Sequence, residues 1–180
     1  MQEEMIDVID ENGIKTGEIL PRREVHKKGL WHRIIIVAII NENNEILIQQ
    51  RSHKKDKNPD MWDISVAGHI ISGQDSLQAT IREINEEIGL DLSEETEIKK
   101  FRYIFSFRKE EFVNENHIDR QYSDFFILRK KGLNQNVLKL QEDEVQKTKF
   151  VSLSELNEMR VKKILVERDE CYNELSNYLK

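Results

Sequence analysis

Seven consecutive apolar residues, 34–40, constrain the fold of this chain more than any other segment. Six of the seven are isoleucine or valine, whose β-branched side chains favour extended backbone. A strand without polar alternation is typical of the middle of a sheet, so we predict a central strand that is buried on both faces. The run is far shorter than the roughly 20 residues of a membrane-spanning helix, and we expect no membrane association.

Composition limits the class of protein. The chain has 180 residues, with 28 basic and 34 acidic side chains, and its net charge of −6 disfavours binding to a nucleic acid polymer. The single cysteine, Cys171, excludes an internal disulfide and a cysteine-based zinc site. Residues 1–5 lack the basic start and apolar run of a signal peptide, so the expected location is the cytoplasm.

Strand-like and helix-like segments alternate irregularly along the rest of the chain. We expect a single domain over residues 1–180, with an N-terminal hairpin extension in residues 1–30 and C-terminal helices in residues 154–180. Further strands are expected at residues 45–50, 62–67, 100–108, 122–130 and 149–153, with a polar loop separating the strands at 100–108 and 122–130. A second C-terminal helical stretch is expected at residues 161–179. The predicted fold class is α/β (α+β), a mixed sheet between layers of helices.

Residues 75–88 have the periodicity of an amphipathic helix. Asp75 and Gln78 can form a capping box at its start, and Gly89 is placed for a C-terminal cap. One stripe of the helix is apolar and is expected to face the core; it consists of Leu77, Ile81, Ile84 and Ile88.

Three glutamates, Glu83, Glu86 and Glu87, lie on one face of this helix, which we expect to be exposed because it points away from the apolar stripe. Three like charges at these spacings repel one another, whereas a divalent cation would make the cluster favourable. Arg82 can pair with Glu86 and orient it. Gly68, at the end of the preceding strand, lets the backbone approach an ion closely and offers a carbonyl oxygen.

With Gly68, Arg82, the three glutamates and Gly89 in this register, residues 68–90 resemble the Nudix box, G-x5-E-x7-R-E-U-x-E-E-x-G-U, where U is aliphatic. The flanking strands extend the resemblance over about residues 5–158. One position departs from the pattern, because Gln74 stands where the family has its first glutamate and supplies no full negative charge. The resemblance implies a Nudix-type mixed sheet and a Mg²⁺-dependent (or Mn²⁺-dependent) hydrolase that cleaves a diphosphate bond by water attack at phosphorus.

The resemblance also implies roles for single residues. Glu86 and Glu87 would bind the metal ion, Glu83 would bind it or act as general base, Gly68 would offer its carbonyl, and Arg82 would orient the glutamates. Residues outside the box, Glu142 or Glu144, are alternatives for the base. The expected partner is a small diphosphate, a nucleoside diphosphate derivative. Because members of the family often dimerise, a second copy of the chain is a further candidate partner.

Two residues outside the box are candidates for binding substrate. Arg51 ends a strand and faces a lysine-containing loop, where a guanidinium can hold a phosphate. Trp62 can stack on a base, or it can belong to the core.

Residues 24–33 are similar to a subgroup of Nudix proteins related to isopentenyl diphosphate isomerase. In that isomerase, histidines before the first core strand and at the start of the box loop help to bind a metal, and His26, His32 and His69 fall at comparable places. An isomerase is therefore one alternative, although residues 62–69 lack the cysteine that its chemistry uses. A nucleotide-binding module with weakened catalysis is the other alternative, favoured by Gln74.

Overall fold

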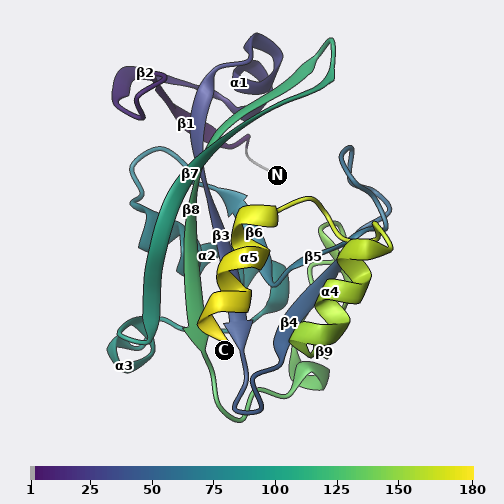
Figure 1. Ribbon diagram of the computed structural model, residues 1–180. Coiled ribbons are helices and arrows are strands. Elements are labelled where there is room, and N and C mark those ends of the chain that lie inside the picture. The colour runs from purple at the N-terminus through teal and green to yellow at the C-terminus, as the bar shows by residue number, and fades with distance from the viewer. Residues whose placement is uncertain (1–2) are drawn as a thin grey trace.

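The computed structural model describes residues 3–180, which form one nine-stranded mixed sheet with five α-helices around it (Figure 1). The elements, in chain order, are β1 (Met5–Ile9), β2 (Lys15–Pro21), α1 (Arg22–Lys28), β3 (Trp31–Ile40), β4 (Ile46–Arg51), β5 (Trp62–Ile64), β6 (Val66–His69), α2 (Ser76–Ile88), α3 (Glu95–Ile98), β7 (Phe101–Asn114), β8 (His117–Arg129), the 3-10 turn η1 (Gln135–Val137), β9 (Val145–Val151), α4 (Leu153–Val161) and α5 (Asp169–Tyr178). Within the described residues, none of the helices has the length and apolar character needed to span a membrane.

Strand β3 is the centre of the sheet. It runs parallel to β8 along its whole length and antiparallel to β6 over residues 34–37. One end of β3 meets β1 and the other meets β4, which in turn pairs with β5 and β9. The prediction of a central strand is confirmed.

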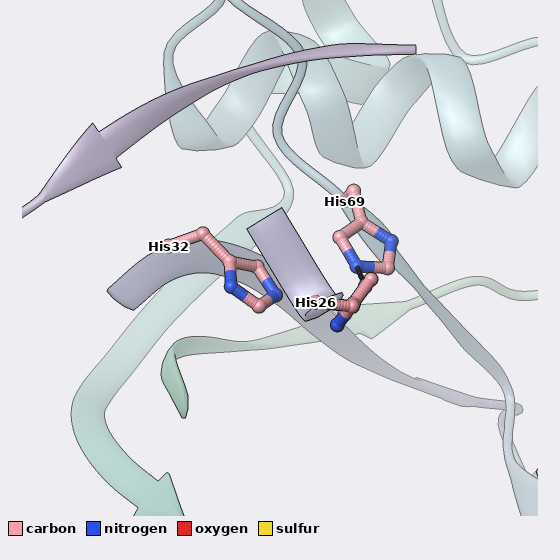
Figure 2. Close-up of side chains that lie close together, drawn as sticks. All are labelled: His26, His32 and His69. Carbon is pink, nitrogen blue, oxygen red and sulfur yellow. Dashed lines mark hydrogen bonds between the residues drawn. The ribbon is translucent and has the colours of Figure 1, made fainter. Parts of the chain in front are cut away.

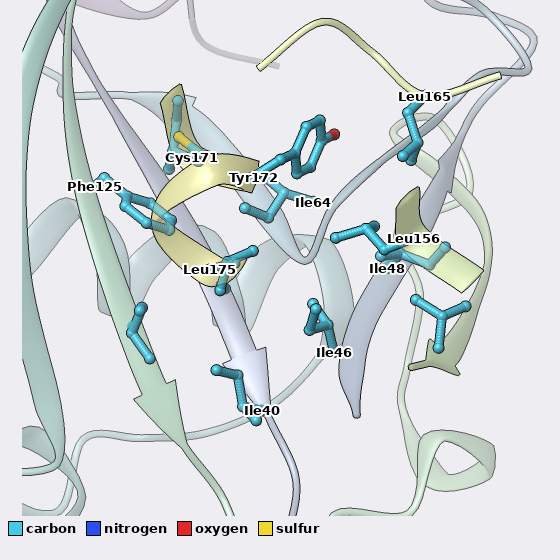
Figure 3. Packing of buried hydrophobic residues seen from close by; sticks show 14 of the residues in the cluster. Ile40, Ile46, Ile48, Ile64, Phe125, Leu156, Leu165, Cys171, Tyr172 and Leu175 are labelled. Atoms are coloured by element: carbon cyan, nitrogen blue, oxygen red, sulfur yellow. The ribbon is translucent and has the colours of Figure 1, made fainter. Parts of the chain in front are cut away.

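The side chains of β3 alternate between two packed layers, as its unbroken apolar sequence predicts. Ile34, Ile36 and Ile40 belong to a core that also contains buried residues of α4 and α5. Figure 3 shows this layer, in which Tyr172 and Leu175 of α5 lie over the sheet. The other face carries the core around Ile84 and Ile88 of α2. The predicted fold class, a mixed sheet between layers of helices, is therefore confirmed.

Helix α2 begins and ends where the sequence predicts. Asp75 accepts a hydrogen bond from the backbone N–H of Gln78, and the Gln78 side chain accepts one from the backbone N–H of Asp75. Gly89 adopts a left-handed conformation with φ of 66° and closes the helix. This glycine lets the chain turn sharply, because residues with a Cβ rarely adopt that conformation.

The segment between the two expected strands at residues 100–130 is not a polar loop, and that expectation is wrong. Residues 109–121 mostly continue β7 and β8 as a long antiparallel ribbon, whose far end reaches α1 (Figure 1). Cross-strand ion pairs such as that between Arg120 and Glu110 replace the apolar alternation that sequence patterns detect.

The last segment also differs from expectation, because after Val161, the last residue of α4, only Asp169–Tyr178 of residues 161–179 is helical. Lys163 has a left-handed φ of 54°, which ends the helical path after α4. Leu165 then forms a parallel bridge with Trp62, so that the chain crosses the sheet edge before α5 begins. The expected strand at residues 62–67 is divided at Ser65 between β5 and β6, which pair with different neighbours.

Candidate active site

Helix α2 holds its three glutamates at different depths. Glu83 and Glu87 are 7% and 5% exposed, whereas the Glu86 side chain is 51% exposed. The expectation of an exposed acidic face is therefore wrong for Glu83 and Glu87. Helical spacing gives the angle between side chains on α2. It does not show that β6 and β3 pack against this helix and bury two of its glutamates, because that depends on the tertiary fold.

Gly68 of β6 makes room for the Glu83 carboxylate. A Cβ atom at position 68 would lie 2.1 Å from the carboxyl carbon of Glu83. Because only glycine leaves this space open, the carboxylate lies directly against the backbone of residue 68. The structure thus brings together two of the residues that we predict to hold a metal ion.

Arg82 connects this carboxylate to its surroundings. Its Nη1 donates a hydrogen bond to Glu86 at 2.7 Å, and its Nη2 donates to the backbone carbonyl of His69 at 2.7 Å. The same Nη2 lies 2.9 Å from Glu83 Oε1. Arg82 therefore fixes both glutamates, as predicted from the spacing for Glu86.

Gln74 contacts Arg82 instead of the cavity that the glutamates line. Its amide oxygen accepts a hydrogen bond from Arg82 Nε at 3.1 Å. An amide oxygen can fill this acceptor position without a negative charge. The departure from the family pattern at position 74 therefore leaves the orientation of Arg82 intact.

Glu87 is held by a residue that the sequence patterns missed. Gln49 of β4 is 3% exposed and donates a hydrogen bond from Nε2 to Glu87 Oε2 at 3.0 Å. Gln49 is the first of three polar residues that end β4, and the sequence does not show that it alone of the three is buried. Gln49 reaches α2 from a strand that is 38 residues away in the chain.

The two inner carboxylates resist ionisation in the absence of a cation. Burial raises the pKa of Glu83 to about 7, with Glu4 and Glu86 adding to the effect and Arg82 opposing it. Burial also raises the pKa of Glu87 well above its ordinary value, and the charges of Glu83 and Glu144 add to this. Buried carboxylates that repel one another fit a divalent cation, whose charge reverses both effects.

A cavity of about 1670 Å³ opens above these glutamates. Its floor is acidic, with Glu83, Glu86 and Glu87 beside Gly68. Its rim carries the basic residues Arg22, Arg51, Lys54, Lys55, Lys57 and Arg168, and acids of the same lining pair with the three lysines. An acidic floor with a basic rim is complementary to a metal-bound polyphosphate, because the floor suits the cation and the rim suits the phosphate oxygens.

Three histidines, His26, His32 and His69, converge, as Figure 2 shows. His26 Nε2 and His69 Nε2 are 3.1 Å apart, and one ligand atom from each of the three rings lies within 4.8 Å of the others. His69 follows Gly68 directly, so the histidine cluster and the carboxylate cluster share one strand end. The three positions suggested by the resemblance to the isomerase are thus brought together.

The contacts of His32 leave one nitrogen lone pair of its ring free for a metal ion. His32 Nδ1 lies 3.1 Å from the carbonyl oxygen of Leu30, which requires a proton on Nδ1, and its Nε2 is buried without a partner among the described residues. Burial lowers the pKa of His32 to about 4 and that of His69 well below its ordinary value. Neutral buried imidazoles fit a divalent ion of the first transition row.

Asp119 of β8 is a second residue that sequence reasoning missed. Its Oδ1 lies 2.9 Å from His26 Nδ1 and accepts from His117 Nε2 at 3.0 Å, while its Oδ2 pairs with Lys57. These contacts hold the pKa of Asp119 far below its ordinary value despite burial. A carboxylate behind a metal-binding histidine fixes the ring and its tautomer. Asp119 lies in the segment expected to be a loop, which concealed its position.

The two candidates for substrate binding are placed differently. Arg51 lines the cavity and donates hydrogen bonds from Nε and Nη2 to the backbone carbonyl of Lys57. Trp62 does not belong to the cavity lining; it packs against the core beneath Lys147 and Lys149. Substrate stacking on Trp62 finds no support in this position, whereas the core alternative agrees with it.

The two candidates for the general base outside the box differ in their position relative to the cavity. Glu144 lines the cavity and pairs with Lys55. Glu142 is exposed and absent from the cavity lining, and only its backbone carbonyl is engaged, by Ser52. Of the two, Glu144 has access to a ligand at the carboxylate cluster.

Comparisons with known proteins agree with this arrangement. The profile of the NUDIX domain family matches residues 30–173. Nudix hydrolase 3 of Arabidopsis thaliana is 37% identical over 158 residues, which are 86% of this chain and 20% of that protein. An uncharacterized Nudix hydrolase of Listeria monocytogenes is 32% identical over 86% of this chain and 83% of its own length. An isopentenyl-diphosphate Delta-isomerase of Pectobacterium atrosepticum is 27% identical over 84% of this chain and 78% of that protein.

A solved structure supports the architecture. The crystal structure of a Deinococcus radiodurans protein superposes with a TM-score of 0.71 at 16% identity, over 97% of this chain and 98% of that one. At this identity the likeness concerns the fold alone. Because the family profile covers most of the residues and a relative above 30% identity is covered over most of its length, this chain belongs to the NUDIX domain family and is an enzyme of the Nudix hydrolase family.

Proposed function

We propose that this enzyme hydrolyses a diphosphate bond in a small molecule, a nucleoside diphosphate derivative, with Mg²⁺ or Mn²⁺ held by Glu83, Glu86, Glu87 and the Gly68 carbonyl. The observation that carries the proposal is the packing of the buried Glu83 carboxylate against Gly68, on the floor of a cavity with a basic rim. Such carboxylates suit hard cations, and a cation there suits phosphate oxygens.

A bound divalent cation would neutralise the diphosphate and lower the pKa of an attacking water. The chain's own residues then have separate tasks. Arg82 orients Glu83 and Glu86, and Gln49 orients Glu87. Glu144 is the better candidate for the base that accepts the proton of the water, because a carboxylate that binds the cation has a lowered pKa and occupied lone pairs. Arg51 faces the phosphates from the rim.

The histidine cluster supports a second divalent site beside the first. His26, His32 and His69 would hold the ion, and Asp119 would orient His26. This cluster is the specific observation that favours the other candidate function, an isomerase of isopentenyl diphosphate.

The only thiol of the chain argues against the isomerase. Cys171 belongs to α5, is fully buried and does not line the cavity. Burial raises the pKa of its thiol to about 12. Such a thiol stays protonated at neutral pH and cannot exchange protons with a ligand from which it is separated. Hydrolysis, which needs no thiol, therefore remains the better supported function.

The experiment is a substrate panel with and without Mg²⁺. Nucleoside diphosphate derivatives, nucleoside triphosphates and isopentenyl diphosphate are incubated with the protein, and the products are separated. We expect Mg²⁺-dependent release of phosphate or pyrophosphate, or of two monophosphates, from at least one nucleotide. An isomerised isopentenyl diphosphate without phosphate release would establish the isomerase instead. Binding of nucleotides without turnover of any panel member would indicate the binding module.

A further inference from the structure

A buried group of three charges lies in one wall of the cavity. Asp63 of β5 is fully buried, and Arg168, just before α5, binds it through two hydrogen bonds, from Nε at 2.6 Å and from Nη2 at 2.9 Å. Arg51 Nη1 lies 3.5 Å from the same carboxylate. Two guanidinium groups thus share one carboxylate at the side of the cavity.

This wall has a positive charge that no acid among residues 3–180 balances by an ion pair. The remaining bonds of Arg51 go to a neutral carbonyl, that of Lys57. The acids on either side of Arg168 in the chain have cations of their own, because Glu167 lies near Lys109 and Asp169 pairs with Arg160. The group therefore has a net charge of +1 where water is largely excluded, and such a charge favours an anion.

The cations of the loop after β4 are already paired with acids. Each of the three lysines of the loop after β4 contacts a carboxylate of another segment: Lys54 with Asp143, Lys55 with Glu144, and Lys57 with Asp119. A substrate phosphate would have to displace a carboxylate to reach any of these lysines. At Arg168 no displacement is needed, because Nη1 has no hydrogen-bond partner within residues 3–180 while Nε and Nη2 are occupied.

The position of Arg168 is fixed before any ligand arrives. The parallel bridge between Trp62 and Leu165 joins its segment to β5. Backbone hydrogen bonds from Trp62 to Ile164 and from Val166 to Trp62 flank this bridge. The guanidinium is therefore held on two sides, by the backbone of its own segment and by Asp63, and its side chain is only 14% exposed. A preorganised donor loses little entropy when it binds.

We infer that Arg168 is a substrate-binding residue, which donates from Nη1 to a phosphate oxygen of the diphosphate on the side away from the glutamates, next to Arg51. The inference deepens the proposed function, on which it rests. The inference also predicts which ligands the cavity prefers. A compound with two linked phosphates would contact both the carboxylate floor and this wall, whereas a monophosphate ester would contact only one of them.

The test uses imidodiphosphate, a diphosphate whose bridging oxygen is replaced by NH, with Mg²⁺ and calorimetry. Arg168→Lys keeps the charge beside Asp63 but loses the forked donor, and we expect it to bind imidodiphosphate on the order of 10-fold to 100-fold more weakly than the wild type. The control Arg102→Gln removes a guanidinium outside the cavity lining and should leave the binding constant unchanged. Turnover of a panel substrate should show a raised KM with little change in kcat.

A purely structural role for Arg168 predicts another pattern. Arg168→Lys would then lower the melting temperature and leave the binding of imidodiphosphate unchanged, which would overturn the inference. If the variant does not fold, a crystal structure of the wild type with imidodiphosphate and Mg²⁺ decides. A phosphate oxygen within hydrogen-bond distance of Arg168 Nη1 supports the inference, and its absence there contradicts it.

The inference and the proposed function can fail separately. Wild-type protein that binds imidodiphosphate through Arg168 and hydrolyses no diphosphate would refute the function and keep the site. Wild-type protein that hydrolyses a diphosphate and binds imidodiphosphate equally well with Arg168→Lys would keep the function and refute the site.

Discussion

The Glu83 carboxylate occupies the space that a side chain at position 68 would fill, since a Cβ on Gly68 would lie 2.1 Å from its carboxyl carbon. Gly68→Ala should therefore displace Glu83 and lower kcat/KM by about 100-fold, the cost of roughly 1 Å of misplacement in a reactive site. Kinetics with Mg²⁺ measure the loss, and circular dichroism checks the fold. Wild-type kinetics in a folded Gly68→Ala protein would show that the close packing is irrelevant to activity.

Glu87→Gln should separate activity from stability. The amide can still accept the hydrogen bond from Gln49, while the cost of burying a carboxyl group whose pKa is raised well above its ordinary value disappears. We expect kcat/KM to fall by more than about 100-fold, because loss of a ligand exceeds the usual loss of a supporting residue. The free energy of unfolding without metal should rise by at least about 1 kcal/mol. Chemical denaturation in EDTA measures this gain, and a less stable variant would contradict the raised pKa of Glu87.

Stability without metal should depend on pH through Glu83. Its pKa of about 7 in the folded protein lies above the ordinary value of 4.5. This group's contribution is therefore fully present below pH 4.5 and is lost as pH rises through 7, at a cost of a few kcal/mol. Glu83→Gln cannot ionise, so its advantage over the wild type in EDTA should grow between pH 4.5 and 7.5.

Comparing the wild type with Glu83→Gln removes the contribution of the histidines to the pH dependence of stability. The pKa of His32 is lowered to about 4, so its contribution is present above pH 6.5 and is lost as pH falls toward 4. That trend is the same in the wild type and in Glu83→Gln and cancels in the difference. Urea denaturation at several pH values measures the difference, and a constant value across the range would contradict the raised pKa of Glu83.

Glu144→Gln and Glu142→Gln form a matched pair. Only Glu144 lines the cavity, so only its amide variant should lower kcat, by about 10²-fold or more for a general base. KM should change little in either variant. Equal activity of the two variants in a steady-state assay would exclude Glu144 as the base and return the role to Glu83.

The histidine cluster should bind a transition metal independently of Mg²⁺ at the glutamates. After dialysis against Mn²⁺ in excess Mg²⁺, which competes for the glutamates, His32→Gln should retain at least about tenfold less Mn²⁺ than the wild type. His53→Gln is the control, because His53 is exposed and lies outside the cluster. Elemental analysis gives the metal content, and equal contents in wild type and His32→Gln would refute the second site.

Local patterns predicted the parts of the fold that local physics determines. The apolar run of β3 and the capping box of α2 correspond to observed elements, because a period and a cap are properties of neighbouring residues. The apolar stripe of α2 was only half right: Ile84 and Ile88 are buried in the core, whereas Leu77 and Ile81 are only partly buried and lie outside it. The left-handed backbone of Lys163 interrupts a segment whose sequence pattern predicts one continuous helix. No neighbouring residue in the sequence indicates this turn.

The site was predictable where one motif contains it. Gly68, Arg82 and the glutamates of α2 meet because a single strand and helix position them. Gln49, Asp119 and Arg168 come from other strands and from the C-terminal segment, at separations that only the tertiary fold closes. Burial of Glu83 and Glu87 likewise depends on the sheet that covers α2.

Hydrolysis in water enriched in ¹⁸O tests the central claim most directly. A responsive diphosphate from the panel is incubated with Mg²⁺ and either wild-type or Glu87→Gln protein, and the phosphate products are analysed by mass spectrometry. Wild-type protein should place one ¹⁸O atom in a phosphate product, and Glu87→Gln should place almost none in the same time. Phosphate products without ¹⁸O, or equal incorporation by both proteins, would contradict water attack at phosphorus supported by these carboxylates.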